Sequence, residues 1–345
     1  MKIEDIAKLA GVSTSAVSLA LNHKPGVSEE TRDLIFKIAN ENNYVPLRSA
    51  SKKRITENKI IRFVACKNKD IVTNDFENLP FFNELIGFLS LEMGNYPYSL
   101  IITSVNTDNI VHQLSEYENE QPSEGIILLG TNLSIEQIQK VKSVQKNTVI
   151  LDTNYLFFDS NFICINNYQG AYEAGLHLIN SGHKKIGYAQ SKTRIYNFEE
   201  RKRGFFNALE TKNLSVPKHH LFDLPAMEIG FKTEDFAYLG TSTNLPSAIF
   251  CENDYIAISM IKTLTEIGIN VPEDISIIGF DDISEAKVVT PELTTIQVNK
   301  KQLTVEALKQ VIREIKEPQS TKSHTFINCS LIERNSVKRI DNTII

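Results

Sequence analysis

The segment GVSTSAVSLALN, residues 11–22, decides how the first part of this chain folds. It follows Ile3 to Ala10, whose apolar spacing predicts a short helix. Gly11, Val12 and Ser13 then predict a turn. A second helix is expected to begin at Thr14, because the Ser13 hydroxyl can accept hydrogen bonds from the free backbone N–H groups at a helix start.

The outward face of this second helix carries short polar side chains and one leucine. Thr14, Ser18 and Asn22 share one face at helical spacing, with Ser15 and Leu19 beside them. Such a face can approach another surface closely, and an α-helix only just fits the DNA major groove. The pattern predicts a helix-turn-helix. Short helices joined by a glycine-containing turn also occur in proteins that bind no DNA, so the rest of the chain has to decide.

A third helix is predicted after Ser28, which can cap it, with Glu29 and Glu30 in its first turn. Its apolar stripe consists of Leu34, Ile35, Ile38 and Ala39. This stripe is expected to pack against apolar residues of the first two helices, namely Ile6, Ala10, Val17 and Leu21. Pro46 ends this unit, which is predicted to span residues 1–46. Residues 47–59 are polar and include the basic run Lys52, Lys53 and Arg54. They are predicted to form either a solvated linker or a hinge that orders on DNA.

Composition bounds the remaining possibilities. A chain of 345 residues is long enough for two or three domains. Its net charge is −5, yet residues 1–62 contain 11 Lys and Arg against 7 Asp and Glu. A basic first part on an acidic remainder favours contact with nucleic acid at one end only.

Several function classes find no support in the sequence. The four cysteines are widely separated, without a CxxC pair or a Cys/His cluster, so we expect reduced, buried thiols and no metal or other cofactor. The signatures of nucleotide-binding loops, esterases and zinc proteases are absent, and we expect no enzyme. His219 and His220 are adjacent and are expected to be solvated. The sequence shows no signal peptide or membrane-spanning run, which predicts a soluble cytoplasmic protein.

From Ile60 onward, short β-rich runs alternate with helical stretches. The predicted strands are 60–66, 98–103, 124–129, 148–151, 162–166, 185–189, 247–251 and 275–280. The predicted helices are 81–93, 135–146, 168–180, 199–212 and 255–268. Alternation of this kind predicts an α/β fold with parallel sheets covered on both faces. About ten strands are many for one sheet, so we expect two Rossmann-like subdomains.

The chain resembles the lactose-repressor (LacI/GalR) family from end to end. The first part resembles the family's DNA-binding head. Further blocks follow in the family's order: PFFNELIGF (80–88), EGIILL (124–129), LINSGHKKIGYA (178–189), ERKRGFFNAL (200–209), AIFCENDYIAI (248–258), VPEDISIIGFDD (271–282) and PELTTIQ (291–297). Together these blocks are far more specific than any one of them.

The resemblance implies a body similar to periplasmic sugar-binding proteins, with two subdomains crossed three times by the chain. We place the body at 60–345, the N-subdomain at about 60–159 with 291–320, and the C-subdomain at about 160–290 with 321–345. It also implies a homodimer that reads a pseudo-palindromic operator on double-stranded DNA. No leucine heptad follows SLIERNSVKRI, so a dimer is expected rather than a tetramer.

The expected function is therefore a transcription regulator, a repressor of carbohydrate-utilisation genes. A sugar or sugar derivative in the cleft between the subdomains would control it. The alternatives are a nucleobase effector, a partner protein, or a solute-binding receptor, although a receptor would need an export signal and no DNA-binding head.

Site residues are carried over from the family position by position. Thr14 and Ser15 match base-reading positions, and phosphate-contact positions are matched by Ser18, Asn22, Ser28 and Thr31. Leu19 stands where the family more often has Arg and can touch a thymine methyl group. In the hinge, Ala50 matches a minor-groove position, but Lys53 stands where a leucine is usual, so strong operator bending is not expected to transfer.

In the cleft, the matching effector contacts are Asp152, Arg201, Asn253 and Asp281, with Asn197, Phe81 and Phe82 as further candidates. Carboxylate and amide oxygens accept from sugar hydroxyls, arginine donates, and an aromatic ring covers an apolar sugar face. The two phenylalanines fit equally well as ordinary core residues of a helix face.

Overall fold

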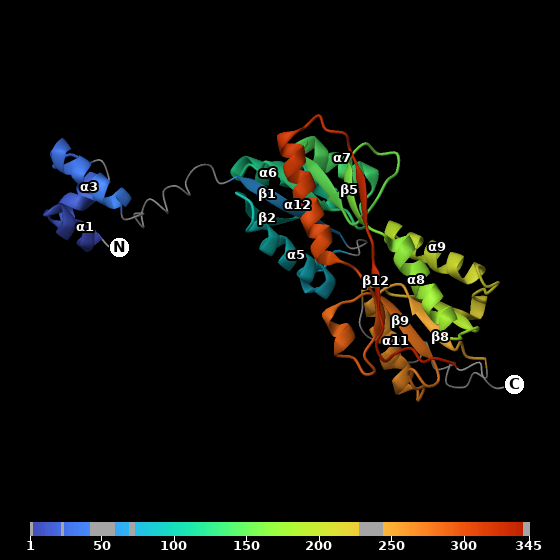
Figure 1. Cartoon of the computed structure of the whole chain (residues 1–345). Coiled ribbons are helices and arrows are strands. Elements are labelled where there is room, and N and C mark those ends of the chain that lie inside the picture. Colours follow the sequence, from blue (N-terminus) through green and yellow to red (C-terminus); the bar gives the residue numbers. More distant parts are fainter. Residues whose placement is uncertain (1–2, 22–23, 42–58, 69–72, 228–243, 341–345) are drawn as a thin grey trace. The chain divides into compact units, whose positions relative to one another are not determined.

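A computed structural model describes residues 3–21, 24–41, 59–68, 73–227 and 244–340 (Figure 1). The chain divides into two compact units, Met1–Asn58 and Lys59–Ile345. Each unit has its own buried apolar core, and each is described by itself.

The first unit contains the three predicted helices, α1 (Ile3–Ala10), α2 (Thr14–Leu21) and α3 (Glu29–Glu41). Both predicted caps are present, because the Ala16 N–H donates to Ser13 Oγ (3.1 Å) and the Thr31 N–H donates to Ser28 Oγ (3.3 Å). Each cap satisfies a backbone donor that the helix itself leaves free.

The core of this unit joins all three helices through buried side chains, namely Ile6, Ala7, Val17, Ala20, Ile35 and Ala39. The predicted stripe on α3 was wrong at Leu34, which is 45% exposed. Ile35, Ile38 and Ala39 already cover the strip of α3 that the other two helices contact, so Leu34 points away from it.

Two six-stranded sheets form the framework of the described part of the larger unit. The first has the order β2-β1-β3-β4-β5-β11, and its neighbouring strands are all parallel. Its strands are β1 (Ile60–Lys67), β2 (Ser99–Asn106), β3 (Gly125–Leu129), β4 (Thr148–Leu151), β5 (Asn161–Ile165) and β11 (His324–Ile327). Its helices are α5 (Pro80–Met93), α6 (Ile110–Glu120), α7 (Ile135–Val144) and α12 (Lys300–Lys316). We call this sheet with its helices the first lobe.

Alternation along the central strands explains why this sheet is covered on both faces. Phe63 and Ile127 belong to the core beneath α5 and α12, whereas Val64 and Ile126 belong to a separate core beneath α6 and α7. Successive strand residues point to opposite faces, so fully apolar strands need a helical layer on each side.

The second sheet has the order β7-β6-β8-β9-β10-β12, and β12 is antiparallel to β10. Its strands are β6 (Ile186–Ser191), β7 (Leu221–Leu224), β8 (Ala248–Cys251), β9 (Ser276–Asp281), β10 (Thr294–Gln297) and β12 (Ser330–Ile332). Its helices are α8 (Asn167–Asn180), α9 (Tyr196–Glu210) and α11 (Asp254–Glu266). Phe280 of β9 lies against α8 at Gly170, and the neighbouring Gly279 lies against α11, so these helices cover opposite faces. We call this sheet with its helices the second lobe.

Four short 3-10 helices complete the described elements, η1 (Phe76–Asn78), η2 (Thr107–Asn109), η3 (Lys218–His220) and η5 (Ser284–Lys287). His220 in η3 is buried, and its ring nitrogen Nε2 lies 2.8 Å from the Asn244 carbonyl oxygen. The prediction that both adjacent histidines are solvated was therefore wrong for His220.

The chain passes between the lobes three times, after β5, after β10 and after β11, as the resemblance implied (Figure 1). The predicted subdomain limits need correction at these crossings. Residues 161–165 and 324–327 pair within the first sheet, and residues 294–297 pair within the second. Strand pairing across the chain, rather than local sequence, decides which sheet a short strand joins.

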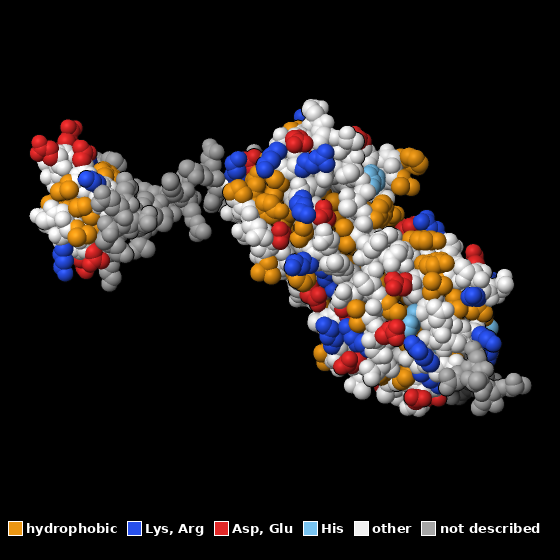
Figure 2. Space-filling view, in the orientation of Figure 1, with side chains coloured by type: hydrophobic (Ala, Val, Ile, Leu, Met, Phe, Trp, Pro, Cys, Tyr) orange, Lys and Arg blue, Asp and Glu red, His pale blue; other side chains and the backbone are white. Residues whose placement is uncertain are grey.

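All four cysteines are buried and free, as predicted. Acidic and basic side chains are interspersed over the face of the larger unit shown in Figure 2, without a field of one sign. Among the described helices, none has both the length and the apolar character needed to cross a membrane.

Candidate functional site

The predicted DNA-contact residues of the first unit that the structure describes lie on α2 and at the start of α3. Thr14, Ser15 and Ser18 of α2 are exposed, and Leu19 is half-buried. At the start of α3 the hydroxyl oxygens of Ser28 and Thr31 lie 2.8 Å apart. The remaining predicted contacts, Asn22, Ala50 and Lys53, lie outside the described residues.

Ser28 and Thr31 are therefore already engaged with each other and with the cap of α3. A hydroxyl that accepts from a backbone N–H still has its own proton to donate, so a phosphate oxygen remains a possible acceptor. Thr14, at the first position of α2, has an exposed side chain at the end of the helix where the dipole is positive. These features are compatible with phosphate and base contact.

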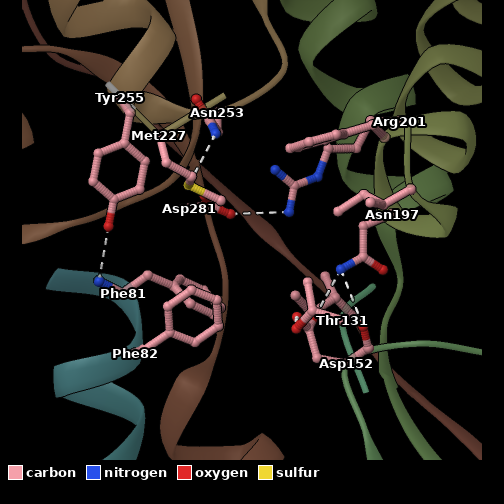
Figure 3. Close-up of a pocket in the computed structure, with 13 residues that line it drawn as sticks. Phe81, Phe82, Thr131, Asp152, Asn197, Arg201, Met227, Asn253, Tyr255 and Asp281 are labelled. Atoms are coloured by element: carbon pink, nitrogen blue, oxygen red, sulfur yellow. Dashed lines mark hydrogen bonds and ion pairs between the residues drawn. The ribbon is translucent and has the colours of Figure 1, made fainter. Parts of the chain in front are cut away.

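In the larger unit, all seven predicted effector contacts line one cavity between the two lobes (Figure 3). They are Phe81, Phe82, Asp152, Asn197, Arg201, Asn253 and Asp281. Asp152 follows β4, Asn253 follows β8 and Asp281 ends β9, so the cavity lies at the carboxyl ends of the strands, where open α/β sheets bind ligands.

Sequence reasoning missed six residues that complete the lining. They are Thr131, Ile165, Ile195, Phe198, Met227 and Tyr255. Thr131 was within reach of the prediction, because it closely follows the strand that ends at Leu129. The apolar members carry no local signal that distinguishes them from core residues.

Asp152 organises one side of the cavity. Its carboxylate accepts from Thr131 Oγ1 (2.6 Å) and from Asn197 Nδ2 (2.9 Å), and the same amide nitrogen donates to its backbone oxygen (3.2 Å). Asn197 belongs to α9 of the second lobe, so these bonds also join the lobes. Burial raises the pKa of Asp152 to about 6, partly opposed by the hydrogen bond from Thr131 and by the charge of Arg201.

Arg201 organises the opposite side. Its guanidinium donates to Asp281 Oδ1 (3.0 Å), to Asn167 Oδ1 (2.8 Å) and to the Glu252 carbonyl oxygen (2.6 Å). Its Cζ lies 3.7 Å from the centroid of the Phe280 ring, a stacking contact that fixes the guanidinium plane. Burial raises the pKa of Asp281, while the neighbouring charges of Arg201 and Lys300 lower it.

Asn253 is the N-cap of α11, where its side-chain oxygen accepts from the Ile256 N–H (2.9 Å). Its amide nitrogen donates to the Ala226 carbonyl oxygen (2.7 Å). Both ends of this side chain are engaged, so a ligand would share or replace the contact to Ala226.

Phe81 and Phe82 satisfy both interpretations that the sequence left open. Both are buried members of the main core, and both line the cavity. Their rings meet edge to face, with centroids 5.2 Å apart. The Phe81 N–H donates to Tyr255 Oη of the second lobe (3.2 Å), which makes a second bond between the lobes.

The cavity is nearly filled by its own side chains. About 20 Å³ of free space remains, which is room for one water molecule. A ligand larger than water has to move the lobes apart or displace side chains that now bond to each other.

Two family models match this chain. The model described as bacterial regulatory proteins, lacI family, covers residues 2–47, and the model of a periplasmic binding protein-like domain covers residues 176–337. The HTH-type transcriptional repressor PurR of Mannheimia succiniciproducens is 30% identical over 346 residues, which span 98% of this chain and 99% of that protein. The chain belongs to the LacI family.

As a LacI-family protein it is a transcription regulator with a helix-turn-helix head and a periplasmic-binding-protein-like body in which an effector binds. The ribose operon repressor of Haemophilus influenzae is 28% identical over 97% of this chain and 98% of that protein. Among solved structures, a lac repressor dimer bound to operator and an anti-inducer has a TM-score of 0.70. It is 20% identical and matches over 98% of this chain and 99% of that one, a likeness in fold.

Proposed function

We propose that this LacI-family regulator represses carbohydrate-utilisation genes and that its effector is a neutral monosaccharide held in the cavity between the lobes. The observation that carries the proposal is the set of charged and amide groups around one cavity with phenylalanine rings at its side (Figure 3). A monosaccharide presents hydroxyls around its rim and C–H groups on its faces. Carboxylates accept from such hydroxyls, and Arg201 and Asn197 donate to them.

The charge balance of the cavity favours a neutral sugar over a phosphorylated one. The lining contains two carboxylates, Asp152 and Asp281, and one cation, Arg201, which is already paired with Asp281. A phosphate would therefore meet Asp152 without an unpaired cation in the lining, and burying an unpaired charge is costly.

A nucleobase is the second candidate, and a relative that is 30% identical is named HTH-type transcriptional repressor PurR. The Haemophilus influenzae relative at 28% identity is named for a ribose operon instead.

Calorimetric titration with D-ribose, D-glucose, cellobiose and hypoxanthine would test the effector class. We expect a monosaccharide to bind, and Arg201→Met to abolish binding. Arg203→Met is the matched control, because Arg203 lies on the same helix with its side chain largely exposed and pairs with Glu200. Binding of hypoxanthine and of none of the sugars would replace the sugar proposal with the nucleobase, and no binding at all would favour a partner protein.

We also propose that the protein acts as a homodimer on a pseudo-palindromic operator in the cytoplasm. Two-fold symmetry of the protein would then match two-fold symmetry of the DNA. A groove of about 520 Å³ on the second lobe supports self-association, and it is lined by α11 and the segment after η5. Ile258, Ile261 and Val289 contribute to it, together with Val288, which is 80% exposed.

Analytical ultracentrifugation of Val288→Glu, with Leu156→Glu as an exposed apolar control outside the groove, would test this surface. We expect only the Val288 variant to become monomeric and to lose affinity for operator DNA in a gel shift. Dimers of unchanged affinity in both variants would exclude the groove as the dimer surface.

A further inference from the structure

Lys300 lies where the two lobes meet, although it is absent from the lining of the cavity. It is the first residue of α12 and is only 4% exposed. A cation at a helix N-terminus is disfavoured by the helix dipole, and a buried charge is costly unless it is paired. The position of Lys300 therefore depends on the groups that surround its ammonium.

Those groups satisfy the ammonium completely. Lys300 Nζ donates to the carbonyl oxygens of Asp281 (3.0 Å) and Asp282 (3.0 Å), and it pairs with Glu84 Oε2 (3.1 Å). It also lies 5.4 Å from the centroid of the Phe81 ring. An ammonium has three N–H donors, and three oxygens are present to accept them.

The two carbonyl groups belong to a strained piece of backbone. Asp281 has φ of 119° and Asp282 has φ of 49°, values in the left-handed region that non-glycine residues seldom adopt. Such strain persists only where the surroundings hold it in place. The Asp281 side chain reaches the cavity and pairs with Arg201. The ammonium thus fixes the backbone from which a cavity-lining carboxylate projects.

Glu84 extends this contact across the lobes. Its second oxygen, Oε1, accepts from the backbone N–H of Ser284 in the second lobe (3.2 Å). Glu84 lies on α5, the helix that also carries Phe81 and Phe82. Lys300 and Glu84 of the first lobe therefore hold residues 281–284 of the second.

We propose that Lys300 is a positioning residue of the effector site. Its ammonium holds the strained turn at Asp281 and Asp282 and, through Glu84, ties that turn to the helix that supplies the phenylalanine rings. The orientation of Asp281 and the approach of the lobes are then set together. This role rests on the proposed function of the cavity as the effector site.

Lys300→Met tests the proposal, and Lys301→Met is its matched control, because Lys301 is the next residue of the same helix, carries the same charge and is exposed. We expect the dissociation constant for D-ribose to rise about tenfold or more in Lys300→Met, because buried carbonyl groups lose their donor. Lys301→Met should stay within about twofold of the wild type, in line with the small effects of surface substitutions. Hydrogen–deuterium exchange provides a readout that needs no ligand, and the peptides covering 81–84 and 281–284 should both exchange faster in Lys300→Met alone.

Glu84→Gln separates positioning from folding, because it keeps an oxygen that can accept from Ser284 while it removes the charge beside Lys300. We expect an intermediate loss of D-ribose affinity with the thermal unfolding temperature unchanged. If the wild type binds neither D-ribose nor D-glucose but Lys300→Met speeds exchange in both peptides, the sugar proposal fails and the positioning role of Lys300 stands. Unchanged exchange of both peptides in Lys300→Met would overturn the positioning role. If the wild type binds D-ribose, the same affinity for D-ribose in Lys300→Met would also overturn it.

Discussion

Gly204 allows α8 and α9 to pack at their closest approach, and Gly204→Ala should therefore perturb both the fold and the cavity. A Cβ atom at Gly204 would lie 2.1 Å from the carbonyl oxygen of Tyr168 in α8. Arg201 lies one turn before Gly204 on α9, and Asn197 lies about two turns before it. A displacement that relieves the overlap would move both cavity-lining side chains.

The expected loss of stability in Gly204→Ala follows from the overlap of the added Cβ atom and from comparison with Gly87→Ala. Relieving the overlap requires a shift of about 1 Å, and overpacking of this kind costs about 1–3 kcal/mol. Replacing glycine by alanine within a helix, where there is room for the Cβ atom, raises the free energy of unfolding by about 0.5–1 kcal/mol. In α5, Gly87 is exposed, and a Cβ there would meet no atom of the described residues within 4 Å beyond the backbone of its own helix. Gly87→Ala should therefore raise the free energy of unfolding by that amount.

Urea unfolding followed by tyrosine fluorescence would measure both variants. The chain has 11 tyrosines and no tryptophan, and every tyrosine except Tyr44 lies after residue 58, so the signal reports the larger unit. We expect the urea midpoint to fall in Gly204→Ala and to rise slightly in Gly87→Ala, and sugar affinity to fall only in the former. Equal midpoints in the two variants would refute the argument from close packing.

Three further predictions concern pH and DNA. Since Asp152 has a pKa of about 6 and its ionised form is the stronger acceptor for a sugar hydroxyl, calorimetry should show affinity falling as pH is lowered below 6. Burial raises the pKa of Asp254 from 3.8 to about 7, so it contributes stability at low pH that is lost as pH rises through 7. Asp254→Asn should make the urea midpoint less dependent on pH between 5 and 8. Selection of operators should show altered sequence preference for Thr14→Ala and Ser15→Ala, whereas Ser18→Ala should weaken all operators alike.

Local sequence was sufficient to predict most of the elements that pack within one lobe, although the predicted helices did not include α6 or α12. The alternation of apolar runs and helical stretches located β1 and α5 closely, because each run is long enough to bury one face. The short strands β7, β10, β11 and β12 were not predicted, because each mixes polar and apolar residues over only three or four positions. The equally short β4 and β8 were predicted, because they are largely apolar runs that are buried along their whole length. Their sheet membership depends on partners far along the chain, which also explains why the predicted limits of the subdomains were displaced.

The cavity shows the same division between local and long-range information. Family resemblance placed Asp152 and Arg201 among the contacts, and the structure brings both to the same cavity. No spacing in the sequence links Lys300 to Glu84, which are 216 positions apart, because α5 and α12 come together only in the folded first lobe. Phe198 and Met227 were missed for a related reason, since an apolar residue that lines a cavity looks the same in sequence as one that fills a core.

The near absence of free space in the cavity constrains how an effector can act. Asn197 bonds to Asp152, and the Phe81 N–H bonds to Tyr255, so the lobes are joined by groups that line the cavity. An effector must open these contacts and replace them. It shifts the equilibrium between the open and closed arrangements of the lobes only by the difference between its affinities for the two. Lys300 and Glu84 bond to residues 281–284 of the second lobe without lining the cavity, so a sugar in the cavity does not replace these bonds directly. A sugar that rearranges Asp281 would therefore act on α5 and α12 through that pair, which gives the effector a physical route from the second lobe to the first.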